Sequence, residues 1–461
     1  RSLSLVFGLI SSPFQSMYCV QDLGVTHQKD FPKAAEVVKT SLYQDDAGFG
    51  TDCLKDAALT AKQLYELLLL GSFPTHKWSA SHQNILKNAG IPSDKWAPGD
   101  SQGFLGLDWL QGGKDEIRYD FRHCIQPAKK FTLREMCSTA AKIFDPLGHF
   151  CAATTTCKLY FRRAVEAEVK WDDELPFDIL NDYLGWRKMV ANMTPFSIPR
   201  PAFVIGEKVF LVGMSDASKD CYAAAIYACS QTKVSLIVAK SRITPLRGKN
   251  SADLTLTIPR LEMMGIEIST SLATMVKDSM PANTFEDTLF FTDSRISLLR
   301  IQNGADKYKV FIAARIRKIL SRTAANKVMG IAGHMNPSDA PTRCRTMEEI
   351  RLDQLWWRAP LWLRRPQSEW PIHKAYTKEQ CREMEAVDAL EIAKSNVSAA
   401  VIAQCPQHSV LTTLEHKCSK FTRIQRITAY ILRFLLAKMP SLSTRDSFLK
   451  GSTLQLSLIH I

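Results

Sequence analysis

The first quarter of the chain alternates short apolar runs with one long helical pattern. Residues 3–14 (LSLVFGLISSPF) predict a strand or a turn, and residues 41–50 (SLYQDDAGFG) predict a hairpin. From Leu54 to Leu70, apolar side chains recur at helical spacing, and Leu64 widens the apolar face. We therefore expect a packed helix directly after the hairpin.

Residues 103–199 combine short strand patterns with longer helical ones. The apolar runs FLGLDWL (104–110) and IRYDF (117–121) each predict a strand, and residues 132–144 and 155–169 each predict a helix. The polar run WDDELP then breaks the second helix. Together these patterns predict a mixed region of strands and helices.

A new pattern starts near Pro201. Three apolar runs lie between turn-like segments and predict a meander: VFLVGMS (209–215), YAAAIYA (222–228) and VSLIVAK (234–240). A helix is predicted from Pro259 to about Lys277, followed by the strand TLFFTD, two helices, the strand KVMGIAG and a last helix. This order of elements predicts a mixed α/β layer.

Length and composition exclude several classes of protein. At about 150 residues per domain, 461 residues suggest about three globular domains. No apolar run reaches the roughly 18 residues that span a bilayer, and SLVFGLI near the start is short and lacks a cleavage site. The 12 cysteines form no CxxC pair or compact framework, so we expect reduced thiols and an intracellular protein without a membrane partner.

The net charge favours a polyanionic partner. The chain has 59 Lys and Arg against 46 Asp and Glu, which gives a formal net charge of +13. An excess of this size attracts phosphate-bearing molecules such as nucleic acid, although charge alone does not select among polyanions.

Two aspartates stand at the ends of apolar strands. Asp216 ends the run VFLVGMSD, and Asp293 ends TLFFTD. An unpaired carboxylate at such a place costs several kcal/mol unless a cation or a partner neutralises it. If the two strands are parallel neighbours, both carboxylates emerge at the same edge of the sheet.

Two more acids lie on neighbouring elements. Glu262 stands one turn into the helix that begins at Pro259, beside an apolar face. That face is expected to contain Leu261, Met264, Gly265, Ile268 and Leu272. Asp339 follows the last strand in NPSDAPTR and would start the last helix.

Four carboxylates from two strands and two helices suit two Mg²⁺ or Mn²⁺ ions about 4 Å apart. Such ions clamp the attacking and the leaving oxygens of a phosphodiester that is being cut. Taken singly, each acid is more simply a cap or a surface charge, Asp339 above all as an N-cap. The joint pattern nevertheless predicts a two-metal nuclease site.

The strings around these acids resemble one family. SDAS, AKSRITPLR, TIPRLE, FTDS, YKVFIAARI, NPSD and LWWRAPLWL together resemble the ribonuclease H domain of BEL/Pao-type LTR retrotransposon polyproteins. The resemblance implies that Asp216, Glu262, Asp293 and Asp339 occupy the four catalytic, metal-binding acid positions, with Mg²⁺ (or Mn²⁺) as the cofactor. Relatives often add a mobile histidine near the last acid. His334 is the one candidate for it, and a solvated loop histidine is the simpler interpretation.

The YQDD hairpin resembles the palm of the same elements' reverse transcriptase. This implies that Asp45 and Asp46 are polymerase metal ligands and that residues 7–14 contact the template or the incoming nucleotide. A palm also needs an earlier aspartate and the fingers, for which the chain starts too late. We therefore expect no DNA synthesis, and detectable primer extension would contradict this. No D-[ST]-G loop occurs, so we expect no aspartic peptidase activity either.

The segment from GFLGLDW to IFDPLGHF resembles the family's connection between palm and ribonuclease H. Within it, Gly148 is expected to stop a helix, and Asp145 is expected to be a structural turn acid rather than a catalytic one. Three tryptophans lie close together in the sequence: Trp356, Trp357 and Trp362. They would either stack on nucleic acid bases or form a packed aromatic cluster, and we favour the cluster.

Towards the C-terminus the chain is more polar, with helices predicted at 377–395 and 420–438. Four residues there could in principle bind zinc: Cys405, His408, His416 and Cys418. Their spacing matches no common zinc site, so we do not favour a metal here. The later helix resembles the lead-in to an integrase, whose catalytic core does not follow.

These observations predict an α/β (mixed α+β) chain of four parts. They are a partial reverse-transcriptase palm (1–95), a connecting, thumb-like region (96–200), a ribonuclease H-like mixed-sheet domain (201–365) and a helical linker toward an integrase (366–461). We expect cleavage of the RNA strand of RNA/DNA hybrids; the alternative is a degenerate retroelement remnant that binds nucleic acid without catalysis. The expected partners are the hybrid and other polyprotein segments (integrase, the missing palm and fingers), and the expected location is cytoplasmic, in virus-like particles, or nuclear.

Overall fold

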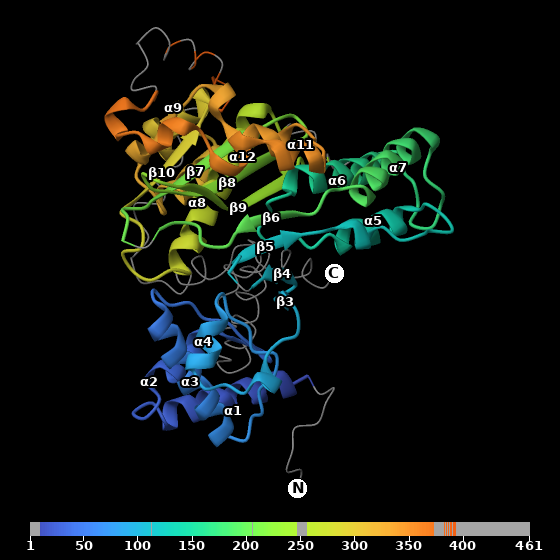
Figure 1. The fold of residues 1–461 in the computed structure, drawn as a ribbon. Helices are drawn as coiled ribbons and strands as arrows, with labels where there is room; N and C mark the ends of the chain where they lie inside the picture. The colour runs from blue at the N-terminus through green and yellow to red at the C-terminus, as the bar shows by residue number, and fades with distance from the viewer. Residues whose placement is uncertain are drawn as a thin grey trace, which may run out of the picture. The chain divides into compact units, whose positions relative to one another are not determined.

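The computed structural model describes residues 10–372 except 112, 205 and 247–255, together with residues 382, 384, 386, 388, 389, 391 and 392. Contacts divide the chain into two compact units, Arg1–Ile392 and Ala393–Ile461, and all described residues belong to the first. Helices and mixed sheets alternate along it, which confirms the predicted α/β class (Figure 1). None of the helices in the described ranges is long and apolar enough to cross a membrane.

The N-terminal elements enclose a small apolar core that includes Val38, Leu64 and Leu67. In chain order they are α1 (Ser12–Thr26), α2 (Pro32–Thr40), β1 (Leu42–Tyr43), β2 (Asp46–Ala47), α3 (Leu54–Leu70) and α4 (Gln83–Asn88). The predicted hairpin and the predicted helix α3 are confirmed. The strand or turn predicted through Phe14 is wrong at its end, because α1 begins at Ser12. Pro13 occupies the first turn of α1, where its missing N–H removes no helical hydrogen bond.

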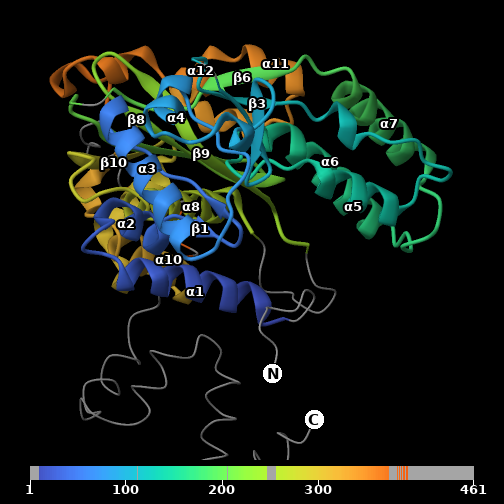
Figure 2. The ribbon, with the colours of Figure 1, turned by 60° about the horizontal axis from the view of Figure 1, so that its bottom comes forward.

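The middle of the chain contains a four-stranded antiparallel sheet and three helices. The strands, in their order across the sheet, are β3 (Ser101–Phe104), β4 (Leu107–Leu110), β5 (Glu116–Tyr119) and β6 (Phe196–Pro199). The helices are α5 (Leu133–Lys142), α6 (Cys151–Glu166) and α7 (Phe177–Ala191). The three helices lie side by side, with α6 in contact with both others (Figure 2).

The single strand predicted over 104–110 is correct only for Leu107–Leu110, which form β4. Phe104 is the last residue of β3, and Leu105 and Gly106, with φ angles of 49° and 80°, form the turn between the two strands. Because both turn residues continue the run of mostly apolar side chains, the run conceals the reversal of the chain.

Gly148 does not end a helix, contrary to the prediction, since α5 already ends at Lys142. Its φ is +69°, and a Cβ built on it would lie 1.9 Å from the carbonyl oxygen of Ala239. The Asp145 carboxylate accepts hydrogen bonds from the backbone N–H groups of His149 and Phe150 at 2.9 and 2.8 Å. Asp145 is thus the structural turn acid that was expected, and Gly148 permits the close approach of two backbones.

We expect Gly148→Ala to lower the free energy of unfolding by about 2 kcal/mol, because it adds left-handed strain and a backbone overlap. Gly185 is a matched control, since it lies in the exposed middle of α7 with nothing within 4 Å of an added Cβ. Gly185→Ala is expected to stabilise the protein by about 0.5 kcal/mol through helix propensity. Urea unfolding of both variants measures the difference, and equal effects would contradict the assigned role of Gly148.

A five-stranded sheet forms the centre of the second half. Its strand order is β11-β10-β7-β8-β9. The elements are β7 (Phe210–Ala217), β8 (Cys221–Cys229), β9 (Val234–Ile243), α8 (Ile258–Asp278), β10 (Asp287–Thr292), α9 (Arg295–Asn303), α10 (Val310–Leu320) and β11 (Val328–Gly330). Strands β7, β8 and β9 form the predicted antiparallel meander, whereas β10 pairs parallel with β7 and β11 pairs parallel with β10.

Both faces of this sheet are buried. Successive residues of β7 alternate between two cores: Leu211 packs with the α8 and α10 side, and Val212 packs with the α6 side. Helix α8 crosses β7 and β8 on one face, while α6 and α12 (Gln354–Arg358) contact β9 (Figure 1). The predicted packed aromatic cluster is confirmed, because Trp356 is buried and the Trp362 ring contacts the rings of Phe291 and Trp370.

The segment after β11 differs from the predicted last helix. Asp339 lies in a 3₁₀ segment, η6 (Pro337–Thr342), whose N-cap is Asn336, and the next α-helix is α11 (Met347–Leu352). Pro341 lies inside this segment and lacks the backbone N–H that a continuing helix needs, whereas Pro337 stands at its first position, where no N–H is required. The helices predicted at 377–395 and 420–438, and the group of cysteines and histidines near the C-terminus, fall largely or wholly outside the described residues.

Candidate active site

The structure places Asp216 and Asp293 at the same end of two adjacent strands. In the parallel register of β7 and β10, Ser215 lies opposite Thr292, so the residues that follow them, Asp216 and Asp293, continue side by side. The negative charge of Asp293 contributes to raising the pKa of Asp216. The expectation that the two strands are parallel neighbours is confirmed.

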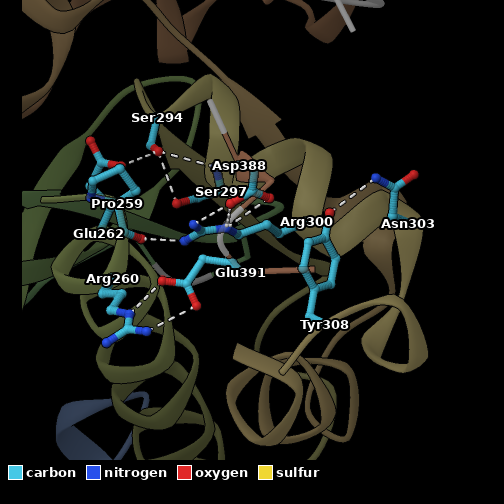
Figure 3. Close-up of polar contacts among 10 residues, drawn as sticks. All are labelled: Pro259, Arg260, Glu262, Ser294, Ser297, Arg300, Asn303, Tyr308, Asp388 and Glu391. Atoms are coloured by element: carbon cyan, nitrogen blue, oxygen red, sulfur yellow. Dashed lines mark hydrogen bonds and ion pairs between the residues drawn. The ribbon is translucent and has the colours of Figure 1, made fainter. Parts of the chain in front are cut away.

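Glu262 reaches this edge from the first turns of α8. Gly265, one turn later, lies so close to β7 that an added Cβ would be 3.2 Å from the Asp216 carbonyl oxygen. Ser294, which follows Asp293, donates a hydrogen bond from Oγ to Glu262 Oε2 at 2.5 Å (Figure 3). The helix is therefore set against the sheet at the level where Glu262 meets the Asp293 segment.

The apolar face predicted for α8 is partly wrong. Met263 and Ile266 are buried, whereas Met264 and Ile268 are only half-buried. The buried side chains of α8 centre on the row 262, 265, 269 and 272, and Gly265 and Ser269 of this row lie against β7. Glu262 thus lies in the packed row rather than beside it.

Asp339 is brought to the same strand edge by the η6 segment. Asn336 Nδ2 donates to the Ser215 carbonyl oxygen at 2.9 Å, and Thr342 Oγ1 donates to Asp216 Oδ2 at 2.5 Å. Arg343 Nε donates to Asp339 Oδ1 at 2.8 Å. The turn therefore delivers one carboxylate and one hydroxyl to the end of β7.

The four acids form one electrostatic group. Burial, and then the negative charges of Asp293 and Asp339, raise the pKa of Asp216 to about 6. Burial raises the pKa of Glu262 to about 7, with further increases from Asp293 and Asp216. Burial and Asp339 also raise the pKa of Asp293, while the Arg343 charge lowers it. Ionising all four at neutral pH therefore leaves unbalanced negative charge at this edge.

The donor set fits a hard divalent cation. Carboxylate oxygens are the ligands that Mg²⁺ and Mn²⁺ prefer. A cation would offset the burial, and the smaller repulsion between carboxylates, that raise these pKa values. In the part of the chain that the structure describes, however, no group of three or more His, Cys, Asp or Glu side chains is arranged as a metal-holding cluster. One oxygen each of Asp216, Glu262 and Asp339 is engaged by a hydroxyl or a guanidinium group.

The other predicted positions are exposed. Asp45 and Asp46 are exposed on the β1–β2 hairpin, where Gln44 has a φ of 54°. His334 is exposed in a short 3₁₀ turn, Gly333–Met335, which lies next to the acids, because a Cβ built on Gly333 would be 3.0 Å from Asp293 Oδ2. Sequence reasoning missed Ser294, Asn336 and Thr342, although Ser294 was visible as a helix N-cap directly after Asp293.

A comparison with protein families matches the centre of the chain. Residues 132–294 match the family described as Pao retrotransposon-like RNaseH-like domain. The matched range contains Asp216, Glu262 and Asp293, and Asp339 lies beyond its end. For this part of the chain, the match confirms the resemblance to Pao-type retrotransposons that the sequence strings indicate.

Solved structures give a weaker likeness. The foamy viral protease-reverse transcriptase in complex with dsDNA is 12% identical with a TM-score of 0.40, over 71% of this chain and 59% of that one. The foamy viral protease-reverse transcriptase dRH in complex with ds DNA is 15% identical, TM-score 0.38, over 70% and 49%. The foamy viral enzyme in complex with an RNA/DNA hybrid is 13% identical, TM-score 0.39, over 70% and 38%. The chain thus spans less than two thirds of the length of each of these proteins. A search of curated proteins found no match.

Proposed function

We propose that this chain cuts the RNA strand of RNA/DNA hybrids, with Asp216, Glu262, Asp293 and Asp339 as the ligands of two Mg²⁺ (or Mn²⁺) ions. The observation that carries the proposal is the parallel pairing of β7 with β10, which brings Asp216 and Asp293 to one sheet edge. The pKa values of Asp216, Glu262 and Asp293, which burial and then neighbouring carboxylates raise, and the family match over 132–294 support it. At the family level, the match supports a nuclease-type enzyme.

The side chains of this edge would orient the carboxylates. Ser294 donates to one oxygen of Glu262, and Thr342 donates to one oxygen of Asp216. The second oxygen of each carboxylate is left for a ligand. Asn336 anchors the turn that carries Asp339 to the backbone of β7. When bound, two divalent ions supply an activated water and stabilise the leaving 3′ oxygen.

The net charge of +13 suits a substrate with many phosphates. The acids concentrate at the proposed site, so basic residues elsewhere are needed to hold the nucleic acid backbone. We propose RNA/DNA hybrid as the substrate because it is the substrate class that the resemblance implies. Asp45 and Asp46 are proposed as metal ligands of a reverse-transcriptase palm.

The test is cleavage of end-labelled duplexes by the purified protein in Mg²⁺. We expect the RNA strand of a hybrid to be cut, with 3′-hydroxyl products, and RNA/RNA and DNA/DNA duplexes of the same sequence to remain intact. Addition of EDTA is expected to abolish cleavage. Tight binding of the hybrid with no cleavage in Mg²⁺ or Mn²⁺ would favour the alternative, a non-catalytic nucleic acid-binding remnant.

A further inference from the structure

Two carboxylates beyond the sheet elements reach the arginines that flank Glu262. Asp388 pairs with Arg300 on α9, and their closest atoms, Oδ1 and Nη2, are 2.5 Å apart. Glu391 pairs with Arg260 on α8, with Nε–Oε1 at 2.5 Å and Nη2–Oε2 at 3.1 Å. Figure 3 shows both pairs beside Glu262. The described residues 388, 389, 391 and 392 are called the strap below.

Backbone contacts hold the strap against the start of α10. Lys309 N donates to the Glu391 carbonyl oxygen at 2.8 Å, and Ile392 forms an antiparallel bridge with Tyr308. The Ile392 side chain also packs on the apolar core beneath α8 and α10. The strap is thus attached by main chain, side-chain charge and apolar contact together.

The pair of Arg300 and Asp388 is almost completely buried, since each side chain is only 2% exposed. Arg300 donates from Nε and Nη2 to the Asp388 carboxylate. Removing one partner of a buried pair is strongly destabilising, because the remaining charge is left away from water without a partner. The position of Arg300 therefore depends on Asp388.

Arg300 connects the strap to the segments that carry two of the candidate ligands. Its Nη1 donates to the Pro259 carbonyl oxygen at 2.7 Å, in the first turn of α8 and three residues before Glu262. Its own helix, α9, begins two residues after Asp293. One guanidinium group thus ties the turn before Glu262 to the helix after Asp293. Arg260, held by Glu391, restrains the same turn of α8 from its other side.

We infer that Asp388 and Glu391 are positioning residues, which hold Arg300 and Arg260 and so fix Glu262 relative to Asp293. The inference rests on the proposed function, in which these two acids share divalent ions. Its consequence is that residues after the sheet elements set the affinity of the site for the metal, although neither Asp388 nor Glu391 touches it.

The test compares Asp388→Asn and Glu391→Gln with wild type in the full chain. Loss of partners that orient metal ligands typically weakens metal binding about 10–100-fold. We expect Asp388→Asn to weaken Mn²⁺ binding, measured by calorimetric titration, about 10-fold, and Glu391→Gln about 3-fold. The Mg²⁺ concentration for half-maximal hybrid cleavage should rise by similar factors. Asp306→Asn is the matched control, because Asp306 forms an exposed ion pair with Arg317 close to α10 and should leave both values unchanged.

A second variant separates positioning from folding. Arg300→Met with Asp388→Leu replaces the buried pair by apolar side chains, a change that proteins often tolerate, but removes the bond to the Pro259 carbonyl oxygen. We expect a folded protein with Mn²⁺ binding weakened about 10-fold. Wild-type Mn²⁺ binding in this variant, or in a folded Asp388→Asn protein, would overturn the inference.

Failure of the proposed function has a different signature. A wild-type protein that binds Mn²⁺ but cuts no hybrid contradicts the nuclease proposal alone, and the Mn²⁺ titrations of the variants then decide the inference. A wild-type protein that binds no Mn²⁺ contradicts both.

Discussion

Replacing Asp293 by Asn is expected to lower the rate of RNA cleavage in a hybrid by about 10³-fold while leaving hybrid affinity within about two-fold of wild type. Asn keeps the shape of the side chain but removes the negative charge, and Asp293 couples electrostatically to Asp216, Glu262 and Asp339. A cation shared by the group should therefore be lost or misplaced. Single-turnover cleavage and filter binding of the same hybrid measure the two quantities.

Asp287→Asn provides the control for this variant. Asp287 is the first residue of the same strand, β10, and so lies at the opposite end of the strand from Asp293. Its carboxylate pairs with Lys327. It should lose no more than about 1 kcal/mol of stability and keep the wild-type cleavage rate. Equal cleavage rates for wild type and Asp293→Asn would show that any catalysis uses another site.

Glu262→Gln is expected to stabilise the metal-free protein at pH 8 by about 3 kcal/mol. Glu262 has a pKa of about 7 in the folded protein against an ordinary value of 4.5. The folded protein thus holds the proton more tightly than the unfolded chain. The contribution of Glu262 to wild-type stability therefore falls as the pH rises from 4.5 to about 7 and is constant above that. The amide introduced by the substitution carries no charge at any of these pH values. The variant therefore does not lose stability through residue 262 as the pH rises.

Urea unfolding at pH 4.5 and pH 8, in EDTA, measures the effect. The advantage of Glu262→Gln should be present at pH 8 and absent at pH 4.5. Glu267→Gln, on the same helix, removes ion pairs with Arg315 and Lys318 and should instead lose up to about 1 kcal/mol. Addition of Mg²⁺ should raise wild-type stability more than that of Glu262→Gln, because the cation relieves the same repulsion. A destabilised Glu262→Gln protein at pH 8 would contradict the electrostatic interpretation of this edge.

Much of the second sheet could be predicted because its signal is local. The apolar runs before Asp216 and Asp293 correctly indicated buried strands, and the two strands proved to be parallel neighbours. Helix α8 begins one residue before the predicted Pro259 and ends one residue after Lys277. Periodicity and proline placement within one segment suffice for such elements.

Other features depend on contacts that no local pattern contains. The turn at Leu105 and Gly106 interrupts a run that is mostly apolar, and Asp339 lies in a 3₁₀ segment that contains Pro341 instead of in the predicted helix. The partners Ser294 and Thr342 are ordinary polar residues until the fold places them beside acids. Asp388 lies 88 positions from Arg300, so their pairing has no signature in sequence spacing.

The most direct test is a crystal structure of the protein soaked in Mn²⁺, with the metal located by its anomalous scattering. The proposal predicts two peaks about 4 Å apart, bound by the carboxylate oxygens of Asp216, Glu262, Asp293 and Asp339. The same soak of Asp293→Asn should lose at least one of the peaks. An absence of peaks at this sheet edge in the wild-type protein, with the four carboxylates ordered, would contradict a two-metal site.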